Sequence, residues 1–344
     1  MTDLGLLYCS FVWGSTFYLV KDAITSVHPV TLVAYRFLSA ALLLLPWVIR
    51  KKKARLLREG AILSALMVLM YLSQTIGMLA TSASNSGFIT GLFIVFVPIF
   101  LLVFLRQPVK AGQWIAVGVA AAGLWVLTGG VRGFNWGDAL TLVTAVAYAW
   151  HVLAIDRYVK RDADTVLLVF HQFWMTGIAC LVLSLAFHLS FRVASPKAAW
   201  IILFLTVFPT LSAFFVQMEA QKRVSPVKAA LFFSLEPVFA AIFAWTLGGE
   251  RFRPSGAVGG GLIVAGMVLS ELSKLSLVRL REKASPELHA ALETRLQGIL
   301  RSFGSDIWTE ERKKFRRRTF LLDRLRKEKF IHHFPEHLGL LYGA

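Results

Sequence analysis

The sequence predicts an all-α polytopic membrane protein with ten transmembrane helices, arranged as two inverted five-helix repeats and followed by a basic cytoplasmic helical tail. Three observations support this fold class. Apolar residues make up 56% of the 344 residues, and one long apolar pattern occurs twice. Charged residues make up only 17%, whereas a soluble domain carries roughly 25%. This composition excludes an ordinary soluble domain and points to the lipid bilayer.

The repeated pattern is the strongest of these observations. Ser225 to Pro237 reads SPVKAALFFSLEP and Ser86 to Pro98 reads SGFITGLFIVFVP. A gapless alignment pairs the serines, a Leu-Phe step and the prolines at one constant offset (237 − 98 = 139). The Gly/Ala-rich runs that follow match at a slightly larger offset (261 − 118 = 143). A proline deep inside a membrane helix requires neighbouring helices to satisfy the freed backbone carbonyl.

Ten apolar segments follow one another along the chain, each of about 20 residues and therefore about 30 Å long as a helix, the thickness of the hydrocarbon core. Short connections rich in proline, glycine, asparagine or charge separate them. The predicted spans are 4–21, 30–49, 60–80, 86–105, 111–129, 136–156, 165–189, 198–219, 226–247 and 255–273. The predicted domains are a first repeat at 1–130, a second repeat at 134–273 and a tail at 274–344.

Loop charges predict the orientation. Connections after odd-numbered spans carry six Lys and Arg residues if Lys21 at a span end is included, and connections after even-numbered spans carry fourteen if Lys228 near a span start is included. Because basic residues concentrate in cytoplasmic loops, both termini are expected in the cytoplasm. Five helices per repeat, an odd number, invert the second repeat, so the two proline helices enter the bilayer from opposite faces. Inverted repeats with interrupted helices are a transporter architecture, in which the binding site lies at the repeat interface.

Residues near the end of the second repeat resemble a known family. The segment 236–251 reads EPVFAAIFAWTLGGER and precedes a Gly-rich last span, a pattern similar to the second repeat of EamA-type transporters of the drug/metabolite transporter (DMT) superfamily. The resemblance covers about residues 4–273. Three further pieces fit the same pattern: the WGST start at Trp13 to Thr16, Arg36-Phe37 in the second span and Gln172-Phe173 in the seventh.

This resemblance implies ten helices and the export or facilitated movement of a small metabolite such as an amino acid. We expect alternating access at the repeat interface and a location in a plasma membrane, the inner membrane in a bacterium. The first repeat departs from the family pattern, with Val97 opposite Glu236 and Gln107 opposite Glu250. Any transport role of either carboxyl would therefore be asymmetric.

Glu236 is the main candidate for a functional residue, because it lies about ten residues into a 22-residue span. A charge at that depth costs roughly 2.5–3.5 kcal/mol on insertion scales, so the carboxyl should be neutral, paired or in contact with water. Two roles fit these conditions. The carboxyl either carries a proton or contacts substrate in a central cavity, or it donates to the Phe233 carbonyl, which Pro237 leaves without its usual partner.

Five further side chains are candidates for a substrate or proton pathway because they lie deep within apolar spans: Trp13, Tyr71, Gln74, Tyr148 and His151. A lone Gln or His in a membrane helix more often bridges to a neighbouring helix, with an average contribution of ~0.6 kcal/mol, than it lines a cavity. Trp13 lies too deep for an interfacial aromatic belt, so it packs in the core or borders a cavity.

Other polar and reactive residues favour structural roles. Arg36 lies near one interface, where snorkelling or pairing with a polar neighbour is favoured over substrate binding. Glu219 is expected in an interfacial ion pair beside Lys222. Two isolated thiols, Cys9 and Cys180, make neither a disulfide framework nor a metal site and are expected as small core residues.

The sequence contains no catalytic motif, and no cofactor or metal site is expected. The expected partners are a small-molecule substrate and the lipid bilayer, with no nucleic acid. Gly256 and Gly260 form a GxxxG pattern, which serves packing within the monomer or, alternatively, a homodimer seam. A polytopic membrane enzyme, or a scaffold that acts through the basic tail, is the alternative function.

The tail at 274–344 holds 16 Lys and Arg residues against 9 Asp and Glu. Between 309 and 335, apolar residues recur at helical spacing among the basic ones. A basic amphipathic helix on the cytoplasmic side suits an anionic lipid surface. The alternatives are a solvated tail and RNA binding, for which no module signature is present.

Overall fold

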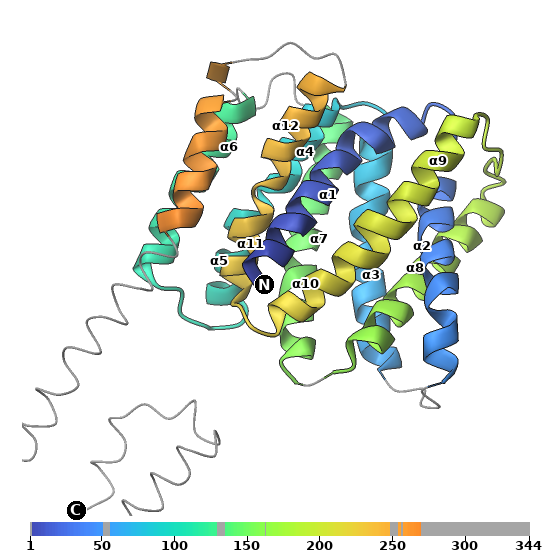
Figure 1. The fold of residues 1–344 in the computed structure, drawn as a ribbon, viewed down its shortest axis with the longest axis horizontal. Helices are drawn as coiled ribbons and strands as arrows, with labels where there is room; N and C mark the ends of the chain where they lie inside the picture. Colours follow the sequence, from blue (N-terminus) through green and yellow to red (C-terminus); the bar gives the residue numbers. More distant parts are fainter. Residues whose placement is uncertain are drawn as a thin grey trace, which may run out of the picture. The chain divides into compact units, whose positions relative to one another are not determined.

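The computed structural model describes residues 2–50, 56–128, 135–161, 163–247, 254–255 and 257–269. The predicted tail, Glu250 and Gly256 therefore lie outside the described residues. This part of the chain contains helices and no β-strands (Figure 1). Within the residues that the structure describes, eight segments are long and apolar enough to cross a membrane, where the sequence predicts ten spans. Two shorter apolar helices, Ala111–Val126 and Ala257–Leu269, occupy the positions of the predicted fifth and tenth spans.

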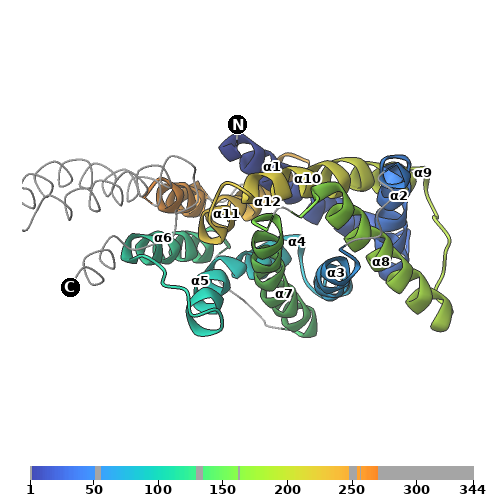
Figure 2. The ribbon, with the colours of Figure 1, turned by 90° about the horizontal axis from the view of Figure 1, so that it is seen from below.

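The helices follow the predicted order closely. They are α1 (Thr2–Ala23), α2 (Pro29–Ile49), α3 (Leu57–Gly77), α4 (Ala83–Gly91), α5 (Phe93–Val103), α6 (Ala111–Thr128), α7 (Trp136–Val159), α8 (Thr165–Ala186), α9 (Pro196–Leu205), the π-helical turn η1 (Thr206–Ser212), α10 (Ala213–Gln221), α11 (Pro226–Phe233) and α12 (Glu236–Thr246). In Figure 2, α6 lies toward one end of this group and α2, α8 and α9 toward the other, with α1, α7 and α12 between them.

Local sequence explains several helix starts. α9 and α11 each begin with a serine cap followed by proline, and Ser195 and Ser225 accept a hydrogen bond from the backbone N–H three residues on. α7 begins with a capping box formed by Asn135 and Asp138. The buried Asp138 carboxylate also accepts from Thr81, so its hydrogen bonds account for its burial without a transport role.

Large apolar side chains face outward on several helices. Leu4, Leu42 and Trp200 are 70%, 68% and 71% exposed. Exposed apolar surface on this scale is unusual for a soluble monomer, whereas lipid hydrocarbon accepts it. Cys9 and Cys180, by contrast, are buried free thiols, as predicted for small core residues.

Two helices are interrupted near their middle. The interruption lies at Leu92 between α4 and α5, and at Ser234 and Leu235 between α11 and α12. α5 and α12 are both 11 residues long, and their starts and ends differ by the same offset (236 − 93 = 143 and 246 − 103 = 143). The helix break is therefore the feature that the two copies share.

The prolines do not occupy equivalent positions. Pro98 lies inside α5, whereas Pro237 lies in the first turn of α12. The predicted gapless alignment of the two prolines is thus wrong by about one helical turn (143 − 139 = 4). In a run of Leu and Phe, a slip of one turn leaves the same face apolar, so the pattern alone does not fix the register. In the structure the counterpart of Glu236 is Phe93, and the predicted counterpart Val97 is one turn further on.

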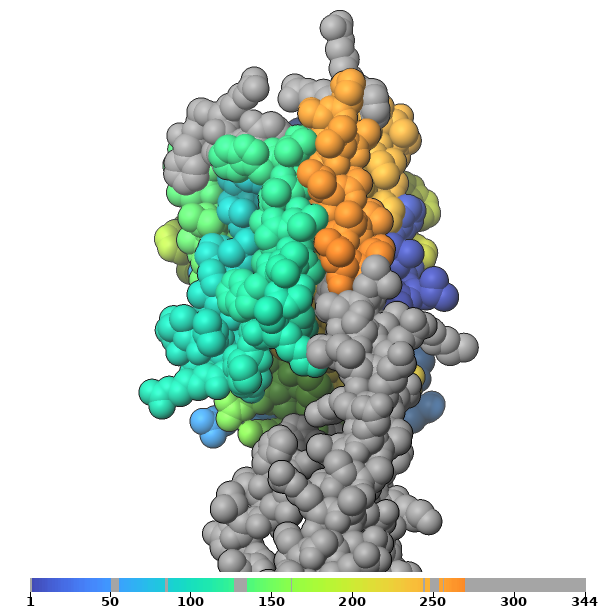
Figure 3. Space-filling view, turned by 90° about the vertical axis from the view of Figure 1, so that its left-hand side faces the viewer, coloured from blue at the N-terminus to red at the C-terminus, as the bar shows by residue number. Residues whose placement is uncertain are grey.

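α6 and the helix at 257–269 pack closely against each other (Figure 3). A methyl carbon built on Gly123 would lie 2.7 Å from the carbonyl oxygen of Gly259, and one built on Gly266 would lie 2.7 Å from that of Ala116. These positions correspond at the offset that relates α5 to α12 (266 − 123 = 143 and 259 − 116 = 143). Gly123 contacts Gly259, which is the counterpart of Ala116, and Gly266 contacts Ala116 in the same way. Both contacts are possible only if the two helices run antiparallel and are related by a local two-fold axis.

Equivalent aromatic side chains also meet one another at the centre. Tyr71 and Phe214 share this offset (214 − 71 = 143). Phe37 and Phe173 each follow a residue of a matched pair, Arg36 and Gln172. Trp13 and Tyr148 each lie midway along the first helix of their copy. The ring centroids of these pairs are 6.4, 5.5 and 6.2 Å apart, respectively. Because residues that contact their own counterparts lie close to a two-fold axis, the axis passes through this aromatic layer.

The antiparallel crossing predicts a matched set of glycine effects. Gly123→Ala and Gly266→Ala should each lower stability by about 1–3 kcal/mol, because the added methyl has no room. Gly118→Ala and Gly261→Ala are the controls, since a methyl group at either position meets nothing within 4 Å. Thermal unfolding of the detergent-purified variants measures the difference. Equal unfolding temperatures for all four variants would contradict the close crossing.

Candidate functional site

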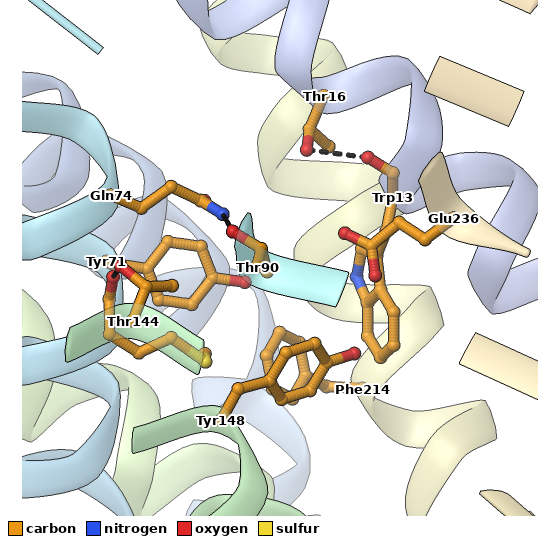
Figure 4. Close-up of a pocket in the computed structure, with 10 residues that line it drawn as sticks. Trp13, Thr16, Tyr71, Gln74, Thr90, Thr144, Tyr148, Phe214 and Glu236 are labelled. Atoms are coloured by element: carbon orange, nitrogen blue, oxygen red, sulfur yellow. Dashed lines mark hydrogen bonds between the residues drawn. The ribbon is translucent and has the colours of Figure 1, made fainter. Parts of the chain in front are cut away.

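A small cavity lies at the centre of the helices, next to the two helix breaks (Figure 4). Its volume is about 30 Å³, which gives room for about two water molecules. Sites for small organic molecules measure roughly 300–1,000 Å³, so the cavity is too small for such a molecule in this conformation. The lining residues come from both copies: Trp13, Thr16, Met70, Tyr71, Gln74, Thr90, Thr144, Tyr148, Phe214 and Glu236.

Five of the six predicted pathway residues line this cavity, namely Trp13, Tyr71, Gln74, Tyr148 and Glu236. The sequence analysis missed the other five. Thr16 lies three residues after Trp13, and Thr144 lies four residues before Tyr148, so helical spacing places each on the same face as a predicted residue. That spacing could have identified them. Met70 likewise lies four residues before Gln74, whereas Thr90 and Phe214 carry no comparable signal.

Glu236 supplies the carboxyl of the cavity lining. Its side chain points into the cavity beside Trp13 (Figure 4) and is only 6% exposed. Oε2 has no hydrogen-bond partner among the described residues, and no hydrogen bond joins the side chain to the Phe233 carbonyl there. α1 approaches closely at this point, because a methyl carbon on Gly14 would lie 2.8 Å from the Glu236 carbonyl oxygen.

A nearby backbone carbonyl at the helix break finds another donor. The Ser10 hydroxyl lies 2.8 Å from the carbonyl oxygen of Phe232, in the last turn of α11. The Leu235 N–H lies 3.0 Å from the same oxygen, so α1 supplies a second hydrogen-bond donor to a carbonyl at the break itself.

Arg36 lies behind Tyr71, away from the cavity, and is only 3% exposed. Its guanidinium donates to the hydroxyls of Thr210 and Tyr71, and its Cζ lies 4.8 Å from the centroid of the Tyr71 ring. The predicted pairing with polar neighbours is confirmed, and the snorkelling alternative is wrong because the side chain is buried. Both acceptors are neutral hydroxyls, so these hydrogen bonds leave the guanidinium charge without a paired anion.

The π-helical turn η1 positions two of these side chains. The Pro209 carbonyl accepts from Trp13 Nε1 at 2.8 Å, and Thr210 Oγ1 accepts from Arg36. α3, the counterpart of this region in the first copy, is a regular α-helix. π-Helical turns occur often at functional sites, since they reorient carbonyls and side chains. Here the turn anchors Trp13 against the cavity.

The other polar groups of the lining differ in how well they are satisfied. Gln74 Nε2 donates to Thr90 Oγ1 at 3.2 Å, and Thr144 and Ser73 share a hydrogen bond of 2.7 Å. The Tyr148 hydroxyl, in contrast, is buried without a partner among the described residues. The cavity therefore offers free hydrogen-bonding capacity at Tyr148 and Glu236, between aromatic rings.

His151 does not line the cavity. It is fully buried beside Phe214, with ring centroids 5.8 Å apart, and its Nε2 lies 3.1 Å from Gln172 Oε1. It thus bridges α7 to α8, as expected for most membrane histidines. Its place in a pathway stays a prediction.

The predicted interfacial ion pair is confirmed, since Lys222 Nζ lies 2.6 Å from Glu219 Oε1. Gln217, two residues earlier, is instead fully buried. The described residues hold no group of three His, Cys, Asp or Glu side chains that could bind a metal ion.

Two interrupted helices that meet at a central cavity, with a carboxyl at one break, match the family that the sequence resembles. The model of the EamA-like transporter family matches residues 1–129 and 135–272. The chain belongs to the EamA-like transporter family. It is therefore a multi-pass membrane transporter of the DMT type.

Individual relatives agree with this assignment. An uncharacterized transporter of Archaeoglobus fulgidus is 30% identical over 273 residues, which is 78% of this chain and 85% of the relative. The uncharacterized inner membrane transporter YedA of Escherichia coli K12 is 25% identical over 284 residues, covering 78% and 90%. The S-adenosylmethionine/S-adenosylhomocysteine transporter of Chlamydia muridarum is 26% identical over 282 residues, covering 75% and 87%. A crystal structure with 17% identity superposes with a TM-score of 0.67 over 80% of this chain and 98% of that chain, which supports the fold.

The two tyrosines of the EamA cavity predict opposite mutational outcomes. Tyr71→Phe removes a hydroxyl that accepts from Arg36 and should cost about 1 kcal/mol of stability, since it leaves a buried charge with one acceptor fewer. Tyr148→Phe removes a hydroxyl without a partner, so stability should stay equal or rise slightly. Thermal unfolding of both variants in detergent tests the difference. A larger loss for Tyr148→Phe would refute this account of the cavity.

Proposed function

We propose that this EamA transporter exports a small organic metabolite with a positively charged amino group, such as an amino acid, through the central cavity. The observation that carries the proposal is Glu236, whose carboxyl points into the cavity with one oxygen unpartnered among the described residues. A buried carboxylate is costly without a positive partner. An ammonium group of the substrate would supply that partner, and protonation of the carboxyl would replace it when the cavity is empty.

The rest of the lining suits the same substrate class. Trp13, Tyr148 and Phe214 surround the carboxyl, and aromatic faces attract cations. The Arg36 charge behind Tyr71 favours an anionic group at that side of the cavity, such as an amino-acid carboxylate. The Chlamydia relative is named for S-adenosylmethionine and S-adenosylhomocysteine, and both molecules carry an amino-acid group.

We further propose ten transmembrane helices as two inverted five-helix repeats, in the inner membrane of a bacterium with both termini in the cytoplasm. The antiparallel crossing at Gly123 and Gly266 and the matched helix breaks support inversion. The named location of the E. coli relative supports the membrane. The tail at 274–344 would bind anionic lipid, and a homodimer stays a prediction. A membrane enzyme or scaffold is not favoured, because the matching relatives are named as transporters.

Transport by this cavity requires alternating access. The closed volume of about 30 Å³ is too small for an amino acid. The two copies must therefore move apart on one face of the membrane and then on the other. The helix breaks next to Glu236 and Phe93 are the points where such motion disturbs the fewest backbone hydrogen bonds.

The first test is substrate counterflow in proteoliposomes with a panel of radiolabelled amino acids and S-adenosylmethionine. Glu236→Gln should reduce the flux of a transported compound roughly tenfold or more, since a charge-assisted hydrogen bond contributes about 1.5–3 kcal/mol. Protein yield and unfolding temperature should stay near those of the parent, because Gln keeps the shape of the side chain. Glu219→Gln, a carboxyl outside the cavity, is the control. Parent-level flux in Glu236→Gln would remove Glu236 from the mechanism.

The second test concerns orientation. Single cysteines at Thr25 and Arg161, which lie in exposed loops at opposite ends of the helices, are placed in a Cys9→Ala/Cys180→Ala background. Thr25→Cys should react with an impermeant maleimide on intact cells, whereas Arg161→Cys should react only after permeabilisation. The reverse pattern would place the termini outside the cytoplasm. Equal labelling would contradict an odd number of transmembrane helices between the two positions.

A further inference from the structure

A second group of buried polar side chains lies beyond Phe214 and outside the cavity. His151 on α7, Gln172 on α8, and Gln217 and Gln221 on α10 are all 0% exposed. Two hydrogen bonds hold them: the His151–Gln172 bond, and one of 3.0 Å from Gln221 Nε2 to the Val152 carbonyl. Polar atoms of every member lack partners among the described residues: His151 Nδ1, Gln172 Nε2, Gln221 Oε1 and both amide atoms of Gln217.

Such a group is unfavourable as plain packing. A buried polar atom without a partner destabilises the fold by about 1–3 kcal/mol. An apolar residue of similar shape at the same place would carry no such desolvation cost. Gln217 is the clearest case, because neither its oxygen nor its nitrogen is satisfied. Unsatisfied buried groups of this kind call for a partner in another state of the protein, such as a ligand or water.

The local two-fold axis relates this group to the cavity. Gln217 is the counterpart of Gln74 (217 − 74 = 143), which lines the cavity and donates to Thr90. The counterpart of Thr90 is Phe233 (233 − 90 = 143), which has no hydrogen-bond acceptor in its side chain. Gln217 therefore lacks the partner that Gln74 has.

His151 also has a counterpart that lines the cavity. The offset between Trp13 and Tyr148 (148 − 13 = 135) also relates Thr16, a lining residue, to His151 (151 − 16 = 135). On the cavity side, Glu236 lies beside Trp13 (Figure 4). On the other side its counterpart Phe93 packs on Tyr148, with ring centroids 4.3 Å apart.

Two phenylalanines stand where the cavity side has polar side chains. Phe93 and Phe233 are the counterparts of Glu236 and Thr90, and both are fully buried. Their ring centroids lie 4.3 and 6.3 Å, respectively, from that of Tyr148. On this side of the axis, aromatic rings therefore take the place of a carboxyl and a hydroxyl.

We infer that His151, Gln172 and Gln217 form a second half-site, which takes up water and neutral hydroxyl or amide groups once Phe93 and Phe233 move away. The half-site is neutral, because it consists of two amides and an imidazole, and it provides both donors and acceptors. It lies toward the ends of α7 and α10 that precede Arg157 and Lys222, and the loop charges place these ends in the cytoplasm. The half-site would therefore open to the cytoplasm. Its existence follows from the two-fold relation, and only the direction of opening rests on the proposed function.

Cysteine accessibility tests this inference without a known substrate. Gln217→Cys and, as matched control, Met218→Cys are made in the Cys9→Ala/Cys180→Ala background, since both positions are 0% exposed on the same helix. The probe is 2-(trimethylammonium)ethyl methanethiosulfonate, applied to inside-out and right-side-out vesicles. Gln217→Cys should react several-fold faster than Met218→Cys, and only in inside-out vesicles. Equal rates for the two positions, or faster reaction from the outer face, would overturn the inference.

A second variant guards against loss of folding. Gln217→Leu should be at least as stable as the parent, because it removes two unsatisfied atoms, and yet it should lower the counterflow of a transported compound several-fold. Lower stability would show that the amide is structural, and unchanged flux would show that it does not line the transport route. Either result contradicts the half-site. If the parent itself transports nothing while Gln217→Cys reacts as expected, the proposed function fails and the half-site stands.

Discussion

Contact between equivalent residues across a local two-fold axis is the constraint on which the rest of this structure depends. A helix that packs against its own antiparallel counterpart must present the same close-packing surface twice, and Gly123 and Gly266 meet that requirement. The same axis brings Trp13 against Tyr148 and Tyr71 against Phe214. The centre of the molecule is therefore an aromatic layer, and the cavity lies where this layer meets the helix breaks.

Function in such a molecule comes from departures from the symmetry. Glu236 has Phe93 as its counterpart, and Thr90 has Phe233, so polar side chains on one side of the layer correspond to buried aromatic rings on the other. The π-helical turn η1 is a third departure, since it holds Trp13 and Arg36 where α3 has a regular helix. Each departure replaces packing by polar or electrostatic interactions, which a low-dielectric environment strengthens.

Under the proposed alternating access, this asymmetry has an energetic consequence. Polar groups on the side of Phe93 and Phe233 lack partners among the described residues in this conformation, which makes the conformation less stable than complete packing would. Opening this side would satisfy Gln217 and His151 with water and would expose Phe93 and Phe233. The opposing costs of unsatisfied polar atoms and exposed rings are of similar size, about 1–3 kcal/mol each. Two conformations of comparable free energy are what an alternating-access cycle requires.

The sequence by itself determined the helical membrane fold, the family and half of the cavity lining. Apolar segments of membrane length and the depth of Glu236, Trp13 and Tyr148 are properties of the chain that any fold of it must accommodate. Only the tertiary structure decided the register of the two copies, because a slip of one helical turn leaves an apolar face unchanged. The tertiary structure alone also placed Arg36 behind Tyr71 and Gln217 in the core. The reason is that the side of a helix that meets a neighbour depends on packing between segments far apart in the chain.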